Sequence, residues 1–231
     1  MDSHLFKGLK KAILLSLICC LNVSSALAEE EFFKISAPLI AQLLPDVEAK
    51  LVSTYHEIGI TAEIIHLPTK RSFEAARKSQ WVDAELARVI EAGDLLSDYI
   101  RVPVPLLSLN IECISFKALP KTITWSSLKS FKVVTLRGFI SITNRLKEHN
   151  TEYYETDSFE QAVAMLKAKR VDILITAKQL LPQPLLTTIL DSSEYQSYVI
   201  DTVKLFHYIR NRHKAILPQL TQAMQKNFSI N

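Results

Sequence analysis

The chain has 231 residues, with 27 Lys and Arg against 24 Asp and Glu, so its formal net charge at pH 7 is +3. Hydrophobic residues make up 48% of the sequence, which suffices for a packed core in one domain or in two small lobes. No long basic run occurs, so the charge gives no reason to expect binding to nucleic acid.

The N-terminal residues have the pattern of a cleavable secretory signal. A basic region, an apolar core and an Ala-Leu-Ala cleavage pattern follow one another at Lys7, Lys10 and Lys11, at residues 12–23 and at residues 26–28. We expect a signal peptide at 1–28 and a soluble periplasmic protein, with an uncleaved anchor as the alternative. Cys19 and Cys20 would leave with the signal, and Cys113 alone cannot form an internal disulfide.

The first half of the mature chain predicts strands that alternate with helices. The expected elements are a strand at 32–37, a helix with an apolar stripe at 44–58, a strand at 61–67, a helix at 70–80 and a strand at 82–89. Pro45 fits the first turn of the first helix, and Gly59 fits its C-terminal stop. This order implies a parallel sheet with right-handed crossovers.

Residues 99–116 read as extended despite Pro103 and Pro105, and we interpret them as the passage to a second lobe. Beyond it we expect a helical turn at 125–128, a strand at 132–136, a helix at 138–149, a strand at 152–155, a helix at 158–169, a strand at 171–176, a proline-interrupted helix at 179–190, a return strand at 198–208 and an amphipathic helix at 215–228.

A short phrase occurs twice. Residues 72–76 read Ser-Phe-Glu-Ala-Ala and precede Val-Asp at 82–83, while residues 158–162 read Ser-Phe-Glu-Gln-Ala and precede Val-Asp at 171–172. Each copy predicts a helix that starts at a Ser cap and leads into a strand. A true repeat would give two similar α/β lobes with a ligand-binding cleft between them, and chance recurrence is the alternative.

The order of elements resembles the periplasmic solute-binding proteins of the type 2 fold, family 3, the amino-acid-type receptors of ABC importers. The segments that carry the resemblance are residues 67–72, 82–88, 101–107, 133–138, 162–172, 205–208 and 212–214. The resemblance covers nearly the whole mature chain and implies an α/β fold of two lobes, each a mainly parallel sheet flanked by helices. We place lobe 1 at 29–107, lobe 2 at 108–197, and a return crossover with a C-terminal helix packing on lobe 1 at 198–231.

The sequence departs from that family in two places. Residues 36–40 lead quickly into a helix, where the family has a Gly- and aromatic-rich loop over the ligand. Residues 175–178 lack the Asp that holds the ammonium of an amino-acid ligand. The missing carboxylate weakens the case for an α-amino acid as the ligand, and both departures favour a non-binding or protein-interaction domain of the same fold.

Two charged residues on the third strand are candidate ligand-binding residues. Arg88 lies at the C-terminal end of a parallel strand, where ligands collect, and the resemblance implies a carboxylate-binding Arg nearby. A surface Arg paired with Glu91 or Asp94 is the alternative. Glu85 lies in an otherwise apolar strand and needs a partner, which could be Arg88, Arg71 or a ligand cation. Strict alternation would place Glu85 and Arg88 on opposite faces of the strand.

The other candidate ligand-binding residues lie at the starts of helices and are Arg71, Arg137, Ser141 and Thr143. A helix start attracts anions through its free N–H groups, and Gly138 permits a tight turn in the second lobe. The alternatives are solvent exposure of Arg71 and plain helix capping by Ser141.

Two tryptophans and two histidines have simpler interpretations. Trp81 and Trp125 each adjoin the start of a strand or turn, which favours core packing over stacking on a ligand. His207 and His213 have no third metal ligand nearby in the sequence, so we expect lobe packing, no metal site and no cofactor.

These features favour a binding protein over an enzyme. We expect a monomer that closes on a small polar or anionic solute and delivers it to the membrane permease of an ABC-type importer or to a sensor kinase. Paired carboxylates, a nucleophile elbow and a phosphate loop are missing, which disfavours a dehydratase-like enzyme with Glu85 as its acid/base. A degenerate non-binding or protein-interaction domain of the same fold is the main alternative, since the sequence has only four glycines.

Overall fold

The computed structural model describes residues 32–116, 118–120, 122–190 and 195–228. The expected signal peptide at 1–28 lies outside these residues. Within the described ranges, no helix combines the length and the apolar character needed to cross a bilayer.

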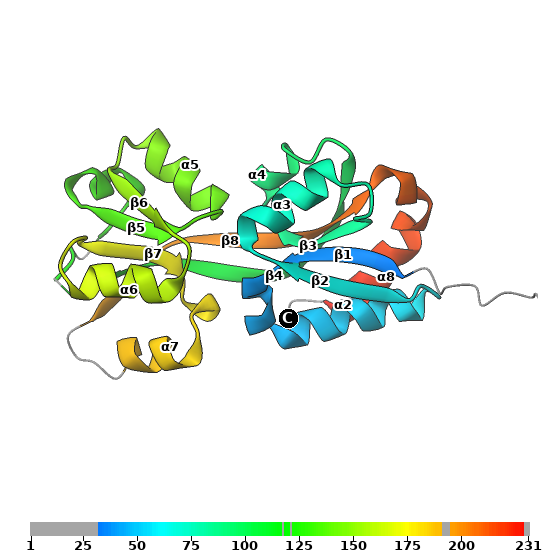
Figure 1. The fold of residues 1–231 in the computed structure, drawn as a ribbon, viewed down its shortest axis with the longest axis horizontal. Helices are drawn as coiled ribbons and strands as arrows, with labels where there is room; N and C mark the ends of the chain where they lie inside the picture. Colours follow the sequence, from blue (N-terminus) through cyan, green and yellow to red (C-terminus); the bar gives the residue numbers. More distant parts are fainter. Residues whose placement is uncertain (1–31, 117, 121, 191–194, 229–231) are drawn as a thin grey trace, which may run out of the picture. The chain divides into compact units, whose positions relative to one another are not determined.

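Strands and helices alternate along the chain (Figure 1). The strands are β1 (Phe33–Pro38), β2 (Ala62–Leu67), β3 (Ala84–Arg88), β4 (Tyr99–Ser115), β5 (Val133–Leu136), β6 (Tyr153–Thr156), β7 (Ile173–Ala177) and β8 (Gln196–Arg210). The α-helices are α2 (Pro45–Glu57), α3 (Thr69–Lys78), α4 (Ile90–Gly93), α5 (Ile140–Glu148), α6 (Phe159–Lys167), α7 (Gln183–Leu190) and α8 (Leu217–Asn227). Short 3-10 helices are η1 (Leu39–Leu43), η2 (Trp125–Ser130), η3 (Lys178–Leu180) and η4 (Asn211–Ile216). The sequence did not predict η1, α4 or η4.

The strands form one sheet with two parallel groups. Their order is β2-β1-β3-β8-β4-β7-β5-β6. β1 pairs in parallel with β2 and β3, and β5 pairs in parallel with β6 and β7. β8 runs antiparallel to both β3 and β4, and β4 runs antiparallel to β7. The two parallel groups are therefore two lobes joined by β4 and β8, which confirms the predicted fold class.

Each lobe has its own hydrophobic core. In the first lobe, α2 and α8 cover one face of the sheet over Ile35, Leu51, Leu86 and Met224, and α3 and α4 cover the other face over Phe73, Leu96 and Phe206 (Figure 1). The core of the second lobe includes Ile114, Leu128, Leu146, Leu166 and Leu174. Along β8, the core contacts change from the second lobe to the first between Leu205 and Phe206.

The two prolines of the passage do not interrupt it. β4 runs unbroken from Tyr99 to Ser115 and contains both Pro103 and Pro105. Its register against β8 shifts between Arg101 and Pro105 and again between Pro105 and Leu107. Because proline has no N–H to donate, such irregular points of a ladder are where a strand tolerates it.

The Val-Asp half of the repeated phrase has the same structure in both lobes. The Asp83 N–H donates to the Lys34 carbonyl at 2.8 Å, and the Asp83 carboxylate accepts from the Lys34 N–H at 2.9 Å. Asp172 makes the same pair of bonds with the backbone of Lys132, at 2.8 and 3.0 Å. Each Asp therefore fastens one strand to its parallel neighbour, β3 to β1 and β7 to β5.

The Ser half of the phrase differs between the lobes, and one expectation is wrong. Ser158 caps α6, where its hydroxyl accepts the Gln161 N–H at 3.3 Å. Helix α3 instead begins at Thr69, directly after Pro68, so Ser72 lies inside the helix and does not cap it. Proline fixes the backbone before the helix, and the helix starts earlier than the Ser predicts. The buried Ser72 hydroxyl is free to contact Glu85.

Candidate ligand-binding site

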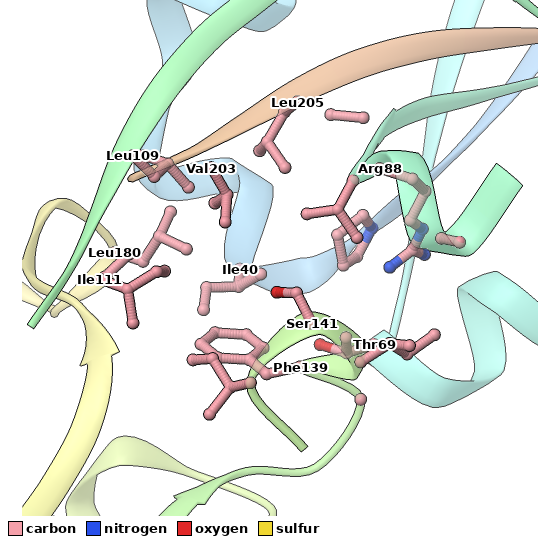
Figure 2. Close-up of a pocket in the computed structure, with 18 residues that line it drawn as sticks. Ile40, Thr69, Arg88, Leu109, Ile111, Phe139, Ser141, Leu180, Val203 and Leu205 are labelled. Carbon is pink, nitrogen blue, oxygen red and sulfur yellow. The ribbon is translucent and has the colours of Figure 1, made fainter. Parts of the chain in front are cut away.

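A mainly apolar pocket of about 100 Å³ lies where elements of both lobes meet, and we call it the interlobe pocket. Its walls come from the end of β3, the start of α3, the β5–α5 turn, and the strands β4 and β8. Only three of its 18 lining residues have polar side chains: Thr69, Arg88 and Ser141. Figure 2 shows Arg88 and Thr69 on one side of the pocket and the labelled Leu and Ile side chains of β4 and β8 on the other.

Arg88 forms a buried ion pair with Glu85. Its Nη2 lies 2.7 Å from Glu85 Oε1, and the two residues are 7% and 0% exposed. Strict alternation would separate these side chains, but the register of β3 against β8 shifts between Glu85 and Arg88. Such a bulge re-aims a side chain, which allows two residues three positions apart to meet. The alternative pairing of Arg88 with Glu91 or Asp94 is therefore wrong.

Two serines complete the surroundings of the Glu85 carboxylate. Ser36 donates its hydroxyl to Glu85 Oε2 at 2.5 Å, and Ser72 donates to Oε1 at 3.2 Å. Burial raises the pKa of Glu85, and the charge of Arg88 and the two hydroxyls offset this effect only in part. The carboxylate is thus fully engaged behind Arg88, and it does not line the pocket.

The guanidinium of Arg88 is only partly used by the protein. Its Nη2 also donates to Ser72 Oγ at 2.9 Å, and its Cζ lies 5.4 Å from the centre of the Phe73 ring. The Nε atom is buried without a partner among the described residues, and no hydrogen bond joins Nη1 to any of them. A buried donor without an acceptor is costly, so this guanidinium is suited to an acceptor supplied from the pocket.

The second lobe meets the first at Gly138. This residue has φ +92°, and a Cβ placed on it would lie 2.9 Å from Thr69 Cγ2 on the other lobe. Helix α5 starts two residues later, with Phe139 at its N-cap position and no side-chain cap, so the capping role considered for Ser141 is wrong. The Ser141 side chain faces the pocket instead (Figure 2).

No protein-family model matches the sequence, and no curated protein matches it either. Solved structures do resemble it. The GluR0 ligand-binding core in complex with L-glutamate has a TM-score of 0.67 at 12% identity, over 89% of this chain and 94% of that chain. Holo ArgBP from T. maritima has a TM-score of 0.63 at 10% identity, over 86% and 91% of the two chains. The VFT2 domain of BvgS from Bordetella pertussis has a TM-score of 0.61 at 11% identity, over 86% and 88%.

The chain has the two-lobed fold of the periplasmic binding proteins. This confirms the resemblance drawn from the sequence at the level of the fold. In this fold the interlobe pocket occupies the junction of the lobes, which is a place where proteins commonly bind small molecules.

The two-lobed fold brings only some of the predicted site residues to the pocket. Arg88 and Ser141 line it, and Glu85 lies directly behind Arg88. Arg71 is exposed on α3, and Arg137 is exposed and 3.0 Å from Asp157. Thr143 donates its hydroxyl to the Ile140 carbonyl at 3.1 Å within α5. These last three residues lie outside the pocket lining.

Residues that had no distinctive pattern in the sequence line much of the pocket. Thr69 lines it from the start of α3, and Phe139 lines it from the β5–α5 turn. The two joining strands contribute four apolar residues that were not singled out: Leu109, Ile111, Val203 and Leu205. Position 69 carried a usable signal, since it follows Pro68 at a helix start, but the apolar residues of β4 and β8 look like ordinary core residues.

A second hollow of about 380 Å³ adjoins the interlobe pocket, and the two share Val89, Ile111, Ser141, Ile142 and Val203. Its lining includes Trp125, whose Nε1 donates to Asp201 Oδ2 at 3.2 Å. Trp125 packs against the core of the second lobe, as predicted. The same prediction for Trp81 is wrong, because its side chain is 42% exposed.

The C-terminal histidines have structural roles in the first lobe. His207 is fully buried, its Nδ1 donates to the Leu86 carbonyl at 3.0 Å, and its Nε2 accepts the Tyr55 hydroxyl at 2.7 Å. Burial lowers the pKa of His207 to about 4. His213 lies 2.6 Å from Asp83. In the described part of the chain, no three His, Cys, Asp or Glu side chains are grouped as metal ligands would be.

Proposed function

We propose that this chain is a periplasmic binding protein that closes its two lobes on a small polar or anionic solute. The interlobe pocket carries this proposal, because both lobes line it and Arg88 keeps unpaired donors at its wall. Structures of the same fold support it, since ArgBP from T. maritima is seen bound to arginine and the GluR0 core is seen bound to L-glutamate. The solute would pass to an ABC-type importer or be reported to a sensor.

The proposal includes the organisation of the chain. A signal peptide at 1–28 would direct export, lobe 1 would span 29–107, lobe 2 would span 108–197, and 198–231 would return to lobe 1. The separate cores support two lobes, and the position of Leu107 against both cores supports the first boundary. Along β8, the contacts pass from the core of the second lobe to that of the first between Leu205 and Phe206. This argues that the chain returns to lobe 1 a few residues after the expected boundary at 198.

Thermal unfolding against a solute panel tests the proposal. The panel contains amino acids, short carboxylic acids, polyamines and phosphorylated metabolites. A solute that binds only the folded state at 100 times its Kd stabilises the protein by about 2.7 kcal/mol, which gives a clear rise in Tm. Closure is then followed by fluorescence energy transfer between dyes on Lys78→Cys in α3 and Glu160→Cys in α6, because buried Cys113 resists labelling.

One observation favours a different function. Glu85 already balances the charge of Arg88, as expected if the pocket is a relic and the domain binds another protein or nothing. A folded protein whose Tm and energy transfer respond to no solute in the panel would support that alternative. We propose no enzymatic role for Glu85, because it does not line the pocket.

A further inference from the structure

We infer that the interlobe pocket selects a short monocarboxylate with an apolar body and without an ammonium group. This inference rests on the proposed function and names the class of solute. It separates the chain from ArgBP and the GluR0 core, which bind arginine and L-glutamate.

The carboxylate would lie against Arg88. Nη2 donates to Ser72 Oγ and lies 2.7 Å from Glu85 Oε1, so both of its close neighbours are protein groups. The remaining donors are Nη1 and the buried, unpaired Nε, and Arg88 is itself 7% exposed. A charge-assisted hydrogen bond to a carboxylate is about twice as strong as a neutral one, so an anion gains most at this position.

Two hydroxyls can assist the same group. Thr69 and Ser141 line the pocket, and no hydrogen bond joins either hydroxyl to another described residue. Figure 2 shows Ser141 and Thr69 on the side of the pocket where Arg88 reaches in. A hydroxyl can donate to a carboxylate oxygen, so the polar end of the pocket offers donors from both lobes.

The rest of the pocket would hold the apolar body and exclude an ammonium. Its wall is made by Ile40, Leu109, Ile111, Phe139, Leu180 and Leu205. No Asp or Glu is among the described lining residues, and Glu91 and Asp201 line the adjoining hollow instead. Taking an ammonium out of water without a partner costs several kcal/mol, which would outweigh the gain at the carboxylate.

The volume limits the length of the acid. A dry apolar cavity of about 150 Å³ in another protein accommodates benzene, which has six non-hydrogen atoms. The interlobe pocket, at about 100 Å³, therefore encloses roughly four such atoms. The four carbons of butanoate match this number and the Leu and Ile wall, and its two oxygens would lie against Arg88.

Isothermal titration with three matched solutes tests the inference on the wild-type protein. Butanoate carries the carboxylate alone, 2-aminobutanoate adds the ammonium, and butanamide removes the charge. We expect butanoate to bind tightest, with each of the others weaker by about tenfold or more, as expected for loss of a charge-assisted bond or burial of an unpaired charge. Equal or tighter binding of 2-aminobutanoate or butanamide would overturn the inference and leave the proposed function standing.

A variant of the second lobe gives an independent test. Ser141→Asp adds a carboxylate to the pocket at the start of α5, where the helix dipole favours a negative charge and the fold is preserved. We expect its preference to shift toward 2-aminobutanoate by about tenfold, while Ser141→Asn, which has the same shape without the charge, weakens binding of both solutes without that shift. If the wild type binds butanoate and the Ser141→Asp variant has the same preference, the inference is contradicted. If no solute of either panel binds the folded protein, the proposed function fails and this inference fails with it.

Discussion

The two lobes share a scaffold but differ at the strand that ends in the pocket. In each lobe a Val-Asp pair directly precedes the strand, and its Asp fastens the strand to its parallel neighbour through the same two hydrogen bonds to a Lys backbone. Five residues after the Asp, the first lobe places Arg88 in the pocket wall and the second places Ala177 there. Two residues after the Asp, the first lobe has Glu85 and the second lobe has Leu174. The repeated phrase thus builds both lobes, whereas Arg88, found in one copy alone, gives the pocket its charge.

The largest effect on stability should come from replacing Arg88 alone by alanine, the residue at the equivalent position of the second lobe. Arg88→Ala leaves the fully buried Glu85 without its cation, and we expect a loss of about 3–5 kcal/mol in the free energy of unfolding. The double variant Glu85→Leu with Arg88→Ala installs both residues of the second lobe and should recover most of that loss. Urea denaturation at pH 7 measures both. If Arg88→Ala is as stable as the wild type, the Glu85–Arg88 ion pair does not stabilise the fold.

The two serines of the phrase should respond in opposite ways to the same substitution. Ser158→Asp keeps a capping oxygen at the start of α6, and we expect a change within about 0.5 kcal/mol. Ser72→Asp places a second carboxylate against Glu85 in the core, and we expect a loss of roughly 3 kcal/mol. Equal effects in denaturant unfolding would mean that the two serines have equivalent surroundings.

Alanine substitutions at two glycines distinguish the effect of backbone strain from the effect of contact between the lobes. Gly59 and Gly138 both have positive φ, at +78° and +92°, but only at Gly138 would a Cβ meet Thr69 of the other lobe. Each Ala variant should lose about 1–2 kcal/mol through its backbone. Gly138→Ala alone should also reduce closure in the energy-transfer assay, and Thr69→Ser, which removes the clashing methyl group, should restore it. Reduced closure in Gly59→Ala would contradict this interpretation.

The smallest effect is the dependence of stability on pH. It belongs to the first lobe alone, because Leu174, at the position equivalent to Glu85, has no charge. Burial raises the pKa of Glu85 above its usual 4.5. The folded protein then holds this proton at pH values where the unfolded chain has lost it, so stability falls as pH rises above about 4.5. Glu85→Gln should remove this fall, and its free energy of unfolding should decline less than that of the wild type between pH 4 and pH 7. Parallel curves would show that Glu85 titrates at its usual pH.

Most of the fold could be predicted from local patterns. Alternation, Pro45 at a helix start and Gly59 at a helix end marked the elements to within a few residues. The pairing of Glu85 with Arg88 could not be predicted, because alternation places them on opposite faces. The bulge that brings them together is a register shift against β8, a strand from the far end of the chain. The apolar pocket wall was equally hidden, since a Leu facing a pocket and a Leu in a core look alike in a sequence.

The joining strands also set the order in which the lobes can fold. The sheet of the second lobe needs β4, β5, β6 and β7, which all precede residue 178. The sheet of the first lobe has its β3 edge open until β8 pairs with it, at Ala84↔Ile209 and Glu85↔Tyr208. Contacts so distant in sequence form slowly, because the long loop between them must close first. When the chain emerges from its N-terminus onward, the first lobe is therefore begun first and finished last, and its exposed β3 edge is the segment most in need of protection before β8 emerges.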